Sequence, residues 1–545
     1  MQSLKATHVS PAEWRWVFVV GGVLTALTLL PYAWALAGMA ASDQWQFMGL
    51  LANPQDGATY LAKIEQGIRG AWLFHLVHTP EPHAGAAINL FYLLLGHFAR
   101  LIGLSSLEIF HLARVATTLF MYSALYMFGA TVWPRLRPRR LFFALVAVGS
   151  GLGWLLLVLG VRAGDIPDLT VPEAYPLYAA YTNPHFPLAI GCLALLAAAY
   201  VDAFRIDFKD PPSAVNGGLG ISLLTLVLVF VLPQALLPLG SALVTYLGVR
   251  AVRSRAVPVR ELRWVMVFVL PIIPAGVYYL LLLQYNWAMQ SWNGQIATFN
   301  TSPVLVVMGY GLLLAVAVPG LVRAVRRFEA DGDQLMLIWL GVNFVLAFLP
   351  FNHQRRMLIG LIIPVVFFAV RSVEDYWLRV IPEHLRMPAV IGLIALVMPS
   401  TILAMGIPLF GIMHPEAGRD EVLLVERGYW DAMQWLDQNG KPDDVVLSSP
   451  NIGLWIPAWG GKRVVYGHPY ETLFAVTKLA QVEAWYRGDC GDLLEQYHVR
   501  YVIVGPQERA LGNGEAGSDA CYAPLQDRSV RHVRFEDVTL YELAD

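Results

Sequence analysis

The sequence predicts a polytopic α-helical membrane protein of about eleven transmembrane helices, followed by an outward-facing α/β domain at the C-terminal end. Hydrophobic residues make up 57% of the 545 residues and charged residues only 14%, whereas soluble proteins have about 25% charged residues. Several apolar runs reach the ~20 residues that cross a bilayer. Beyond about residue 413 charged residues rise to the density of a soluble domain. The net charge of -2 argues against a nucleic acid partner.

The first span runs from about Trp16 to Leu36. It is too long for the core of a signal peptide, so we interpret it as a retained signal anchor. Further spans are expected at 109–130, 141–160, 186–204, 217–231, 234–249, 264–284, 303–320, 335–350, 357–371 and 388–409. Leu232-Pro233-Gln234 divides 217–249 into a hairpin, or kinks one helix, since proline is tolerated inside transmembrane helices. Run 88–104 contains His97 and Arg100 and is expected to lie at the membrane interface.

Arginines gather in three linkers, at 135–140, 250–263 and 321–327. With about eleven spans these linkers fall on one side, which the positive-inside rule assigns to the cytoplasm. We therefore expect a bacterial-type inner or plasma membrane protein with a cytoplasmic N-terminus. The predicted domains are a multi-span membrane domain at 1–412, with an outward juxtamembrane loop at 39–108, and an extracytoplasmic α/β domain at 413–545.

The C-terminal region alternates predicted strands and helices. Buried strands are expected at 445–449 and 501–505, and helices at 425–438, 473–487 and 491–497. Cys490 and Cys521 both lie in this outward region, where oxidation is possible, and we expect them to form a disulfide. Cys192 lies within a predicted span and is expected to be a packing residue.

The segment after the first span is the most polar part of the N-terminal half. On a helix, Asp56, Tyr60, Lys63 and Gly67 are spaced 4, 3 and 4 residues apart, so they share one face. That face combines a carboxylate, a phenol and an amine beside a histidine-rich loop. It is where we expect chemistry.

This segment resembles the start of the GT-C glycosyltransferases, and among them the bacterial relatives of protein mannosyltransferases and of the lipid A aminoarabinose transferase. The matching residues are Asp56, Tyr60, Gly70-Ala71-Trp72-Leu73, Phe91-Tyr92 and Phe110-His111-Leu112-Ala113-Arg114. Two positions depart from the family pattern. Gly57 stands where a second acid is usual, and Glu81-Pro82-His83 replaces a Lys-Pro-Pro. Gly57 leaves this segment without the second acid of the family's metal-binding carboxylate pair. The absence of Lys-Pro-Pro removes the family's usual lipid-phosphate contact.

The resemblance implies an inverting transfer of a sugar from a polyprenyl-phosphate donor to an acceptor at the outer face of the membrane. Asp56 is then the general base that takes the acceptor's proton; the alternative is that Asp56 caps a helix beginning near Gly57. Tyr60 and Lys63, which share its face, are expected to bind the substrate or the lipid phosphate. The outward turn with His353, Gln354, Arg355 and Arg356 is the expected site for the lipid phosphate, with snorkelling to the interface as the alternative.

Further candidate site residues are Glu81, His83, Arg114, His185 and His468. His468, with Glu471, either points toward the site or belongs to a surface loop. The loop histidines His75, His78 and His83 with Glu81 offer ligands for a divalent metal, but their spacing matches no metal signature, so no cofactor is expected with certainty.

The expected partners are the lipid-linked donor and membrane lipids; the acceptor remains open among glycan, lipid and protein. Two other functions also remain open: a transporter or flippase, and a non-catalytic GT-C-like subunit of a membrane assembly.

Overall fold

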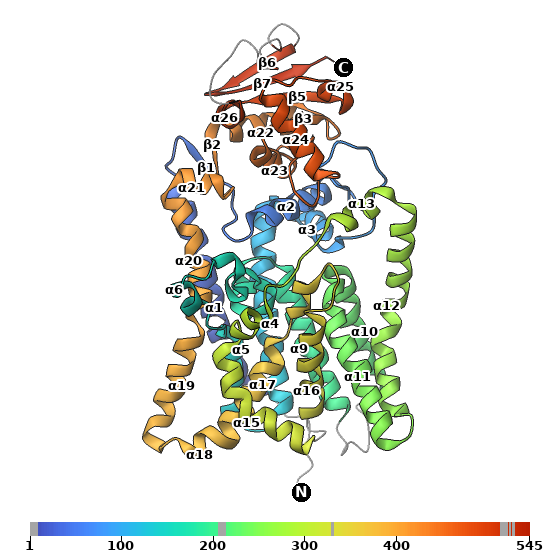
Figure 1. The fold of residues 1–545 in the computed structure, drawn as a ribbon, viewed down its shortest axis with the longest axis vertical. Helices are drawn as coiled ribbons and strands as arrows, with labels where there is room; N and C mark the ends of the chain where they lie inside the picture. Colours follow the sequence, from blue (N-terminus) through green and yellow to red (C-terminus); the bar gives the residue numbers. More distant parts are fainter. Residues whose placement is uncertain are drawn as a thin grey trace. The chain divides into compact units, whose positions relative to one another are not determined.

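A computed structural model of the chain describes residues 9–204, 214–328, 332–512, 521–522, 525 and 529–544 (Figure 1). The chain divides into two compact units. Unit 1 contains Met1–Leu30, His111–Tyr279 and Ala297–Ile407, and unit 2 contains Pro31–Phe110, Leu280–Ile296 and Pro408–Asp545. Segments distant in the sequence therefore fold together in each unit.

Unit 1 is helical, and helices coincide with every predicted span. The helices that lie in or enter this unit are α1 (Pro11–Met39), α4 (Ser106–Val132), α5 (Leu136–Val148), α6 (Gly153–Val158), α9 (His185–Ala203), α10 (Ala214–Val231), α11 (Leu236–Ser254), α12 (Val259–Tyr285), α14 (Pro303–Met308), α15 (Gly311–Arg327), α16 (Asp333–Leu346), α17 (Ile362–Ser372), α19 (Glu383–Val397) and α20 (Pro399–Met413). Within the described ranges, eight helical segments are long and apolar enough to cross a membrane. The predicted class of polytopic helical membrane protein is confirmed.

The other predicted spans correspond to shorter helices. The part of α10 at Gly217–Val231 and α16 are apolar but shorter than the spanning helices, and the expected span 303–320 is divided between α14 and α15. α10 and α11 are separate helices joined by the 3₁₀ turn Pro233–Ala235, because Pro233 lacks the N–H that a continuous helix would use. Leu232–Pro233 thus ends one helix rather than kinking it.

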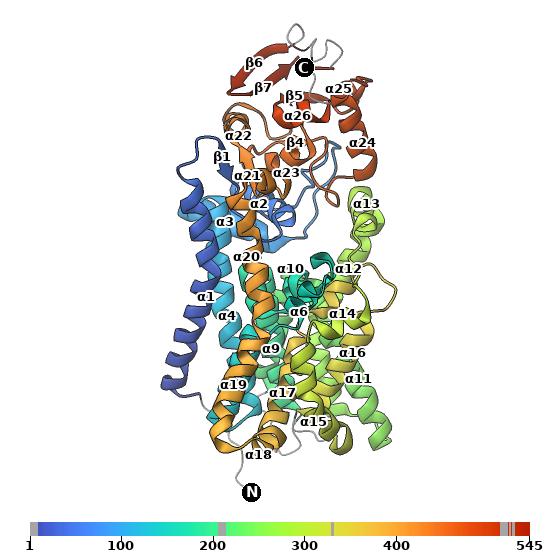
Figure 2. The ribbon, with the colours of Figure 1, turned by 60° about the vertical axis from the view of Figure 1, so that its left-hand side comes forward.

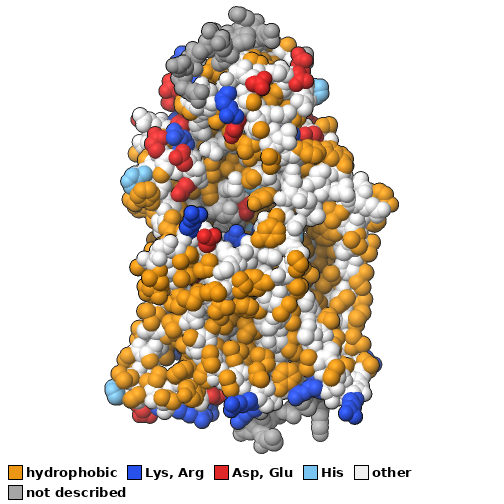
Figure 3. Space-filling model, viewed as in Figure 1, with side chains coloured by type: hydrophobic (Ala, Val, Ile, Leu, Met, Phe, Trp, Pro, Cys, Tyr) orange, Lys and Arg blue, Asp and Glu red, His pale blue; other side chains and the backbone are white. Residues whose placement is uncertain are grey.

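Two of the three arginine-rich linkers, at 135–140 and 321–327, each contribute an arginine that pairs with an acid of one π-helical turn, η5 (Val373–Trp377). Arg137, in the first turn of α5, pairs with Glu374 at 2.5 Å, and Arg323 near the end of α15 pairs with Asp375 at 2.7 Å. Figure 3 shows Lys and Arg side chains gathered at one end of this helical unit, below a largely hydrophobic flank. Such a distribution is typical of a membrane-embedded bundle with one basic face.

Unit 2 contains a five-stranded sheet of order β4-β3-β5-β7-β6. Strands β3 (Val445–Leu447), β4 (Arg463–Val464) and β5 (Val499–Val504) are parallel, while β6 (Ser529–Phe535) and β7 (Val538–Leu543) form an antiparallel hairpin at the edge (Figure 2). Alternate strand residues point to opposite faces, and two hydrophobic clusters form there. The predicted strands and helices of this region are present.

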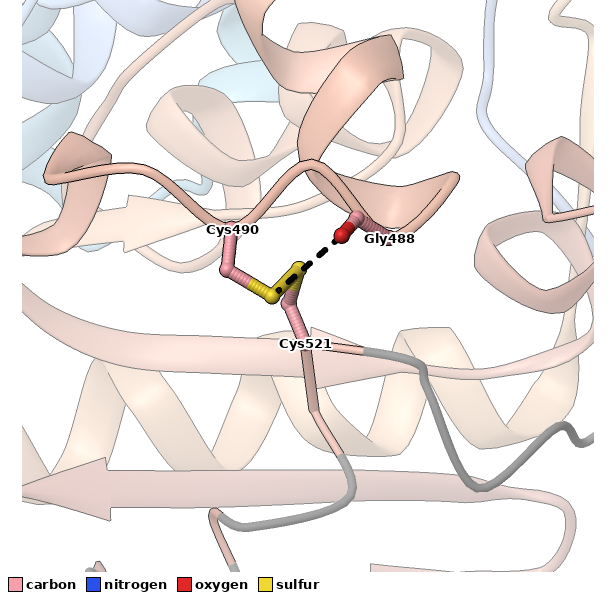
Figure 4. Close-up of a disulfide and its surroundings, with 3 residues drawn as sticks. All are labelled: Gly488, Cys490 and Cys521. Carbon is pink, nitrogen blue, oxygen red and sulfur yellow. Dashed lines mark hydrogen bonds between the residues drawn. A yellow bond between two sulfur atoms is a disulfide. The ribbon is translucent and has the colours of Figure 1, made fainter.

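Helices cover both faces of the sheet. α22 (Arg427–Asn439) and α23 (Pro450–Trp459) pack on one face and α24 (Ala475–Tyr486) on the other. The shorter helices α21 (Pro415–Asp420), α25 (Leu493–Gln496) and α26 (Pro506–Leu511) complete this part of the chain. Cys490 and Cys521 form the expected disulfide (Figure 4). The α/β layering and the disulfide were both predicted.

The segment 39–108 divides differently from the prediction, which assigned it to the membrane domain. Strand β1 (Trp45–Phe47) pairs antiparallel with β2 (Leu424–Glu426). Helices α2 (Pro54–Ile68) and α3 (Leu90–Ile102) contribute to the hydrophobic core that contains α22 and α23. This arrangement fixes α2 against the C-terminal part of the chain.

α2 and α3 approach each other closely at two glycines. A Cβ on Gly67 would lie 2.2 Å from the carbonyl oxygen of Leu93, and one on Gly96 would lie 2.1 Å from that of Ile64. Only glycine allows such an approach. With 13 residues, α3 is about 20 Å long, which is too short to cross a bilayer. This length is compatible with the expected position of run 88–104 at the membrane interface.

Candidate active site

Asp56 lies in the first turn of α2, which begins at Pro54. The N-cap residue is Asn53, whose side chain makes no cap bond to the backbone. Its Nδ2 instead donates to Asp56 Oδ2 at 2.7 Å. The interpretation of Asp56 as the cap of a helix beginning near Gly57 is therefore wrong, because proline at the first helical position moves the start toward the N-terminus. The Asp56 side chain is 33% exposed.

His468 faces the other oxygen of this carboxylate. Its Nε2 lies 3.6 Å from Asp56 Oδ1. Its Nδ1 accepts the backbone N–H groups of Tyr470 at 3.1 Å and Glu471 at 3.0 Å. A nitrogen that accepts two hydrogen bonds carries no proton, so the ring proton is on Nε2 and points toward Asp56. His468 is buried, and the interpretation of this segment as a surface loop is wrong.

Glu471 forms a buried ion pair with Lys63 on the same helix face as Asp56. Lys63 Nζ donates to Glu471 Oε1 at 2.5 Å and to Thr59 Oγ1 at 2.9 Å. Burial alone would raise the pKa of Glu471, but the positive charge of Lys63, with smaller effects of His468 and His78, holds this pKa below its usual value. Lys63, predicted to contact substrate or lipid phosphate, thus lies behind the exposed carboxylate with its charge paired.

His78 completes the buried layer behind Asp56. Its Nε2 donates to the carbonyl oxygen of Leu454 at 3.1 Å, and its Nδ1 lies 3.8 Å from Glu471 Oε2. Burial is the main cause that lowers the pKa of His78 to about 4, because a charged imidazolium is poorly solvated there. The ring is therefore neutral near pH 7.

The loop 467–472 that carries His468 and Glu471 is fixed from two directions. The Thr472 hydroxyl accepts the N–H groups of Gly467 and His468 and donates to the carbonyl oxygen of His78 at 2.7 Å. Gln295, the last residue of α13 (Trp287–Gln295), donates to the carbonyl oxygens of Tyr470 and Thr472. Satisfied backbone groups of this kind hold a loop in one conformation.

The remaining predicted residues of unit 2 have structural contacts. Tyr60 stacks on Tyr92, with ring centroids 4.5 Å apart. Glu81 pairs with the buried Lys478 at 2.5 Å, and His83 donates from Nδ1 to the carbonyl oxygen of Glu81 at 2.8 Å. Burial lowers the pKa of Lys478 to about 8, against the opposing effect of Glu81.

No metal centre is found within the part of the chain that the structure describes. Among these residues, no three His, Cys, Asp or Glu side chains lie together as a metal site would require. His83 Nε2 accepts the N–H of Leu76 at 3.0 Å, and the Glu81 carboxylate is held by Lys478. These two proposed ligands are thus engaged with the protein itself.

Unit 1 collects the other predicted residues around its segment 170–186. Arg356 Nη1 donates to Glu173 Oε1 at 2.7 Å, and Arg355 Nη2 donates to the carbonyl oxygen of Thr170. Arg114 Nη1 donates to the carbonyl oxygen of Tyr181 at 2.6 Å. Buried His185 begins α9 in the same segment. The turn η4 (Gln354–Leu358) therefore braces this segment.

The neighbours of this turn are also in place. Gln354 Oε1 accepts the N–H of Asn300 at 3.1 Å, and its Nε2 donates to the carbonyl oxygen of Leu349 at 2.8 Å. His353 is half-buried just before the turn. These contacts hold the turn in one conformation.

The fold is shared with solved membrane enzymes. The oligosaccharyltransferase of Archaeoglobus fulgidus, tethered to an acceptor peptide with the NVT sequon, aligns with a TM-score of 0.54, 11% identity, and coverage of 94% of this chain and 72% of that one. ArnT from Cupriavidus metallidurans bound to undecaprenyl phosphate aligns with a TM-score of 0.52, 14% identity, and coverage of 98% of each chain. The chain has the fold of the GT-C membrane glycosyltransferases.

The apo form of the same oligosaccharyltransferase aligns similarly, with a TM-score of 0.53, 13% identity, and coverage of 91% of this chain and 70% of that one. No family model matches the sequence, and no curated protein matches it. The likeness is therefore one of GT-C fold, as the resemblance at Asp56–Arg114 implied.

Proposed function

We propose that this GT-C chain is an inverting glycosyltransferase that moves a sugar from a polyprenyl-phosphate donor to an acceptor at the outer face of the membrane. The GT-C fold supports the class of enzyme, and the undecaprenyl phosphate bound to ArnT, similar in fold over 98% of both chains, supports the class of donor. The observation that carries the proposal is the partly exposed Asp56 carboxylate in front of a buried polar layer.

In the proposed reaction an acceptor hydroxyl or amine attacks the anomeric carbon opposite the phosphate. The new bond to carbon forms as the bond from carbon to phosphate oxygen breaks, and its electron pair leaves with the polyprenyl phosphate. The acceptor's proton passes to Asp56, which acts as general base. The attack from the opposite side inverts the anomeric carbon.

The leaving phosphate requires cationic hydrogen-bond donors. We assign this role to the η4 turn of unit 1, with Arg355 as the principal contact and His353, Gln354 and Arg356 beside it. A guanidinium has five N–H donors in a fixed fork, so one bond from Arg355 to Thr170 is compatible with a further bond to phosphate. His185 and Arg114 are assigned to supporting the same segment.

Within unit 2 we assign Lys63 to holding Glu471 rather than to the phosphate, because Lys63 is only 2% exposed. Tyr60 beside Tyr92 and the Glu81–His83 turn are assigned to shaping the surface around Asp56. No step requires a metal, so a divalent ion is not part of the proposal.

We further propose that the N-terminus is cytoplasmic and that the C-terminal α/β domain is extracytoplasmic, in a bacterial-type inner or plasma membrane. The basic linkers at one end of unit 1 support this orientation. The disulfide between Cys490 and Cys521 supports an oxidising location for the domain, because disulfides are rare in reducing compartments.

The proposal is tested by reconstituting the protein in liposomes with a panel of radiolabelled polyprenyl-phosphate sugars and a lipid, glycan and protein extract of the membrane. Release of polyprenyl phosphate with transfer of label to one acceptor class is expected. Movement of intact labelled lipid between leaflets without bond cleavage would instead indicate a flippase. Neither event with any donor would contradict an enzymatic role and favour a non-catalytic subunit.

A further inference from the structure

We propose that His468 is a positioning residue that holds the Asp56 carboxylate through its Nε2–H, so that the loop 467–472 sets the orientation and protonation of the base. The kinetic part of this proposal rests on the proposed glycosyltransferase function. The contact between the two side chains does not, and it can be tested without turnover.

The His468 ring is held in one direction by its own loop. The two backbone N–H groups on Nδ1, from Tyr470 and Glu471, fix both the tautomer and the plane of the imidazole. The ring is 2% exposed, and its Nε2 makes no hydrogen bond within the described residues. A buried N–H without an acceptor is costly. Asp56 Oδ1, at 3.6 Å, is the acceptor that a small tightening of the site would supply.

Each oxygen of the Asp56 carboxylate faces a different side chain. Asn53 Nδ2 donates to Oδ2 at 2.7 Å, while His468 faces Oδ1. One donor on each side leaves a carboxylate with little rotational freedom, and an ionised carboxylate has about four lone-pair sites. A base held in this way loses less entropy on meeting its substrate.

Further titratable side chains surround His468. Its own loop contributes Glu471, whose carboxylate is paired with Lys63 of α2, and the neutral ring of His78 lies 6.0 Å away between centroids. Tyr470 lies 5.9 Å away by the same measure. Among the described residues, the titratable groups around the ring are therefore Asp56, Glu471, Lys63, His78 and Tyr470. Among the described residues, the carboxylate that lies within ion-pair distance of Nε2 is that of Asp56, so the Nε2–H acts on that carboxylate.

A hydrogen bond to the charged form of a carboxylate favours that form. Removing the Nε2–H should therefore make Asp56 take up a proton at higher pH. It should also slow turnover, because the orientation of the base is less fixed. A purely structural histidine would alter stability without moving the protonation of Asp56.

The test uses two substitutions that separate the two ring nitrogens. His468→Asn keeps an acceptor near the Nδ1 position and removes the donor to Asp56. His468→Gln keeps a donor near the Nε2 position. His532→Asn, on the exposed face of the edge strand β6, is the matched control. Carbodiimide with glycine ethyl ester couples protonated carboxyl groups, and mass spectrometry then follows labelling of Asp56 against pH in the full-length protein.

We expect the midpoint of Asp56 labelling to rise by about 0.5–1 pH unit in His468→Asn and to stay near the wild-type value in His468→Gln and His532→Asn. The acid limb of kcat/KM should move in parallel. An unchanged midpoint in His468→Asn, or an equal rise in both His468 variants, would overturn the proposal. Should His468→Asn fail to fold, His468→Ala, which removes the same Nε2–H donor, takes its place, with the same expected rise and the same overturning result. A shifted midpoint without transferase activity in the wild type would refute the proposed function alone.

Discussion

Breaking the buried ion pair of Lys63 and Glu471 should lower the free energy of unfolding by a predictable amount. The two side chains are 2% and 9% exposed and their charged atoms lie 2.5 Å apart. Removing one member of such a pair leaves an uncompensated buried charge, which typically costs about 3–5 kcal/mol. Lys63→Met should therefore destabilise the protein by about that amount at pH 7.5. The double variant Lys63→Met with Glu471→Gln should recover most of the loss.

The pH dependence of the single variant provides a second check. Without Lys63, burial raises the folded-state pKa of Glu471 above its unfolded value. The stability lost by the variant is then small below the unfolded pKa and grows as the pH rises through the folded pKa. The thermal unfolding midpoint of Lys63→Met, measured against the wild type in one detergent, should fall further behind at pH 7.5 than at pH 5.

The assay is a double-mutant cycle on thermal unfolding midpoints, with Lys441→Met on the exposed surface as a control. We expect the two single changes to be strongly non-additive, with a coupling of at least about 2 kcal/mol. Single variants that each cost less than about 1 kcal/mol, or costs that simply add, would refute the ion pair as a structural element behind Asp56.

Three further outcomes follow from the site. The wild-type protein should lose stability as the pH falls from 6.5 toward 4. In this range unfolded His78 binds a proton that the folded ring does not, because burial lowers the pKa of the folded ring to about 4. His78→Gln should remove about 3 kcal/mol of this loss, and an unchanged loss would exclude His78 as its cause. Arg355→Ala and Arg356→Ala should each weaken donor binding by about 1.5–3 kcal/mol, measured as donor KM beside the unfolding midpoint, and an unchanged KM in both would assign these arginines to bracing. A cysteine at the exposed Val530 should react with an impermeant maleimide in intact cells, and labelling only after rupture would contradict the proposed orientation.

Local sequence patterns predicted the elements of this chain well. Apolar runs located the membrane helices because a bilayer demands long continuous apolar segments. The 4, 3 and 4 spacing predicted that Asp56 and Lys63 share one face of α2, and the structure directs both toward the loop 467–472. The disulfide followed from compartment and cysteine number. Each of these predictions depended on short stretches of sequence.

The partners of that helix face could not be predicted in the same way. His468 and Glu471 lie about four hundred residues from Asp56 and Lys63, and no local periodicity encodes such a contact. The pairing of β1 with β2 has the same difficulty, since Trp45 meets Glu426. The start of α2 was misplaced for a local reason. Pro54 sets the first turn, and the capping preference of aspartate was given too much weight.

The buried histidine and glutamate did carry a faint signal. A His-x-x-Glu between aromatic residues in a polar loop is unusual on an exposed surface, but charged and polar residues are mostly exposed. Burial of His468 and Glu471 became evident only with the Lys63 ion pair and the Thr472 hydroxyl that fix the loop. The tertiary contacts of His468 therefore decide between the two alternatives that the sequence left open, a surface loop and a position facing Asp56.

The central claim is that the Asp56 carboxylate accepts the acceptor's proton, and turnover of Asp56→Asn beside its unfolding midpoint tests it most directly. The substitution keeps an oxygen for the bond from Asn53, so the fold should be retained, but an amide cannot accept the proton. We predict a loss of about 10²–10⁴-fold in single-turnover rate with a midpoint close to that of the wild type. Near-normal turnover in a stable Asp56→Asn protein would contradict the account.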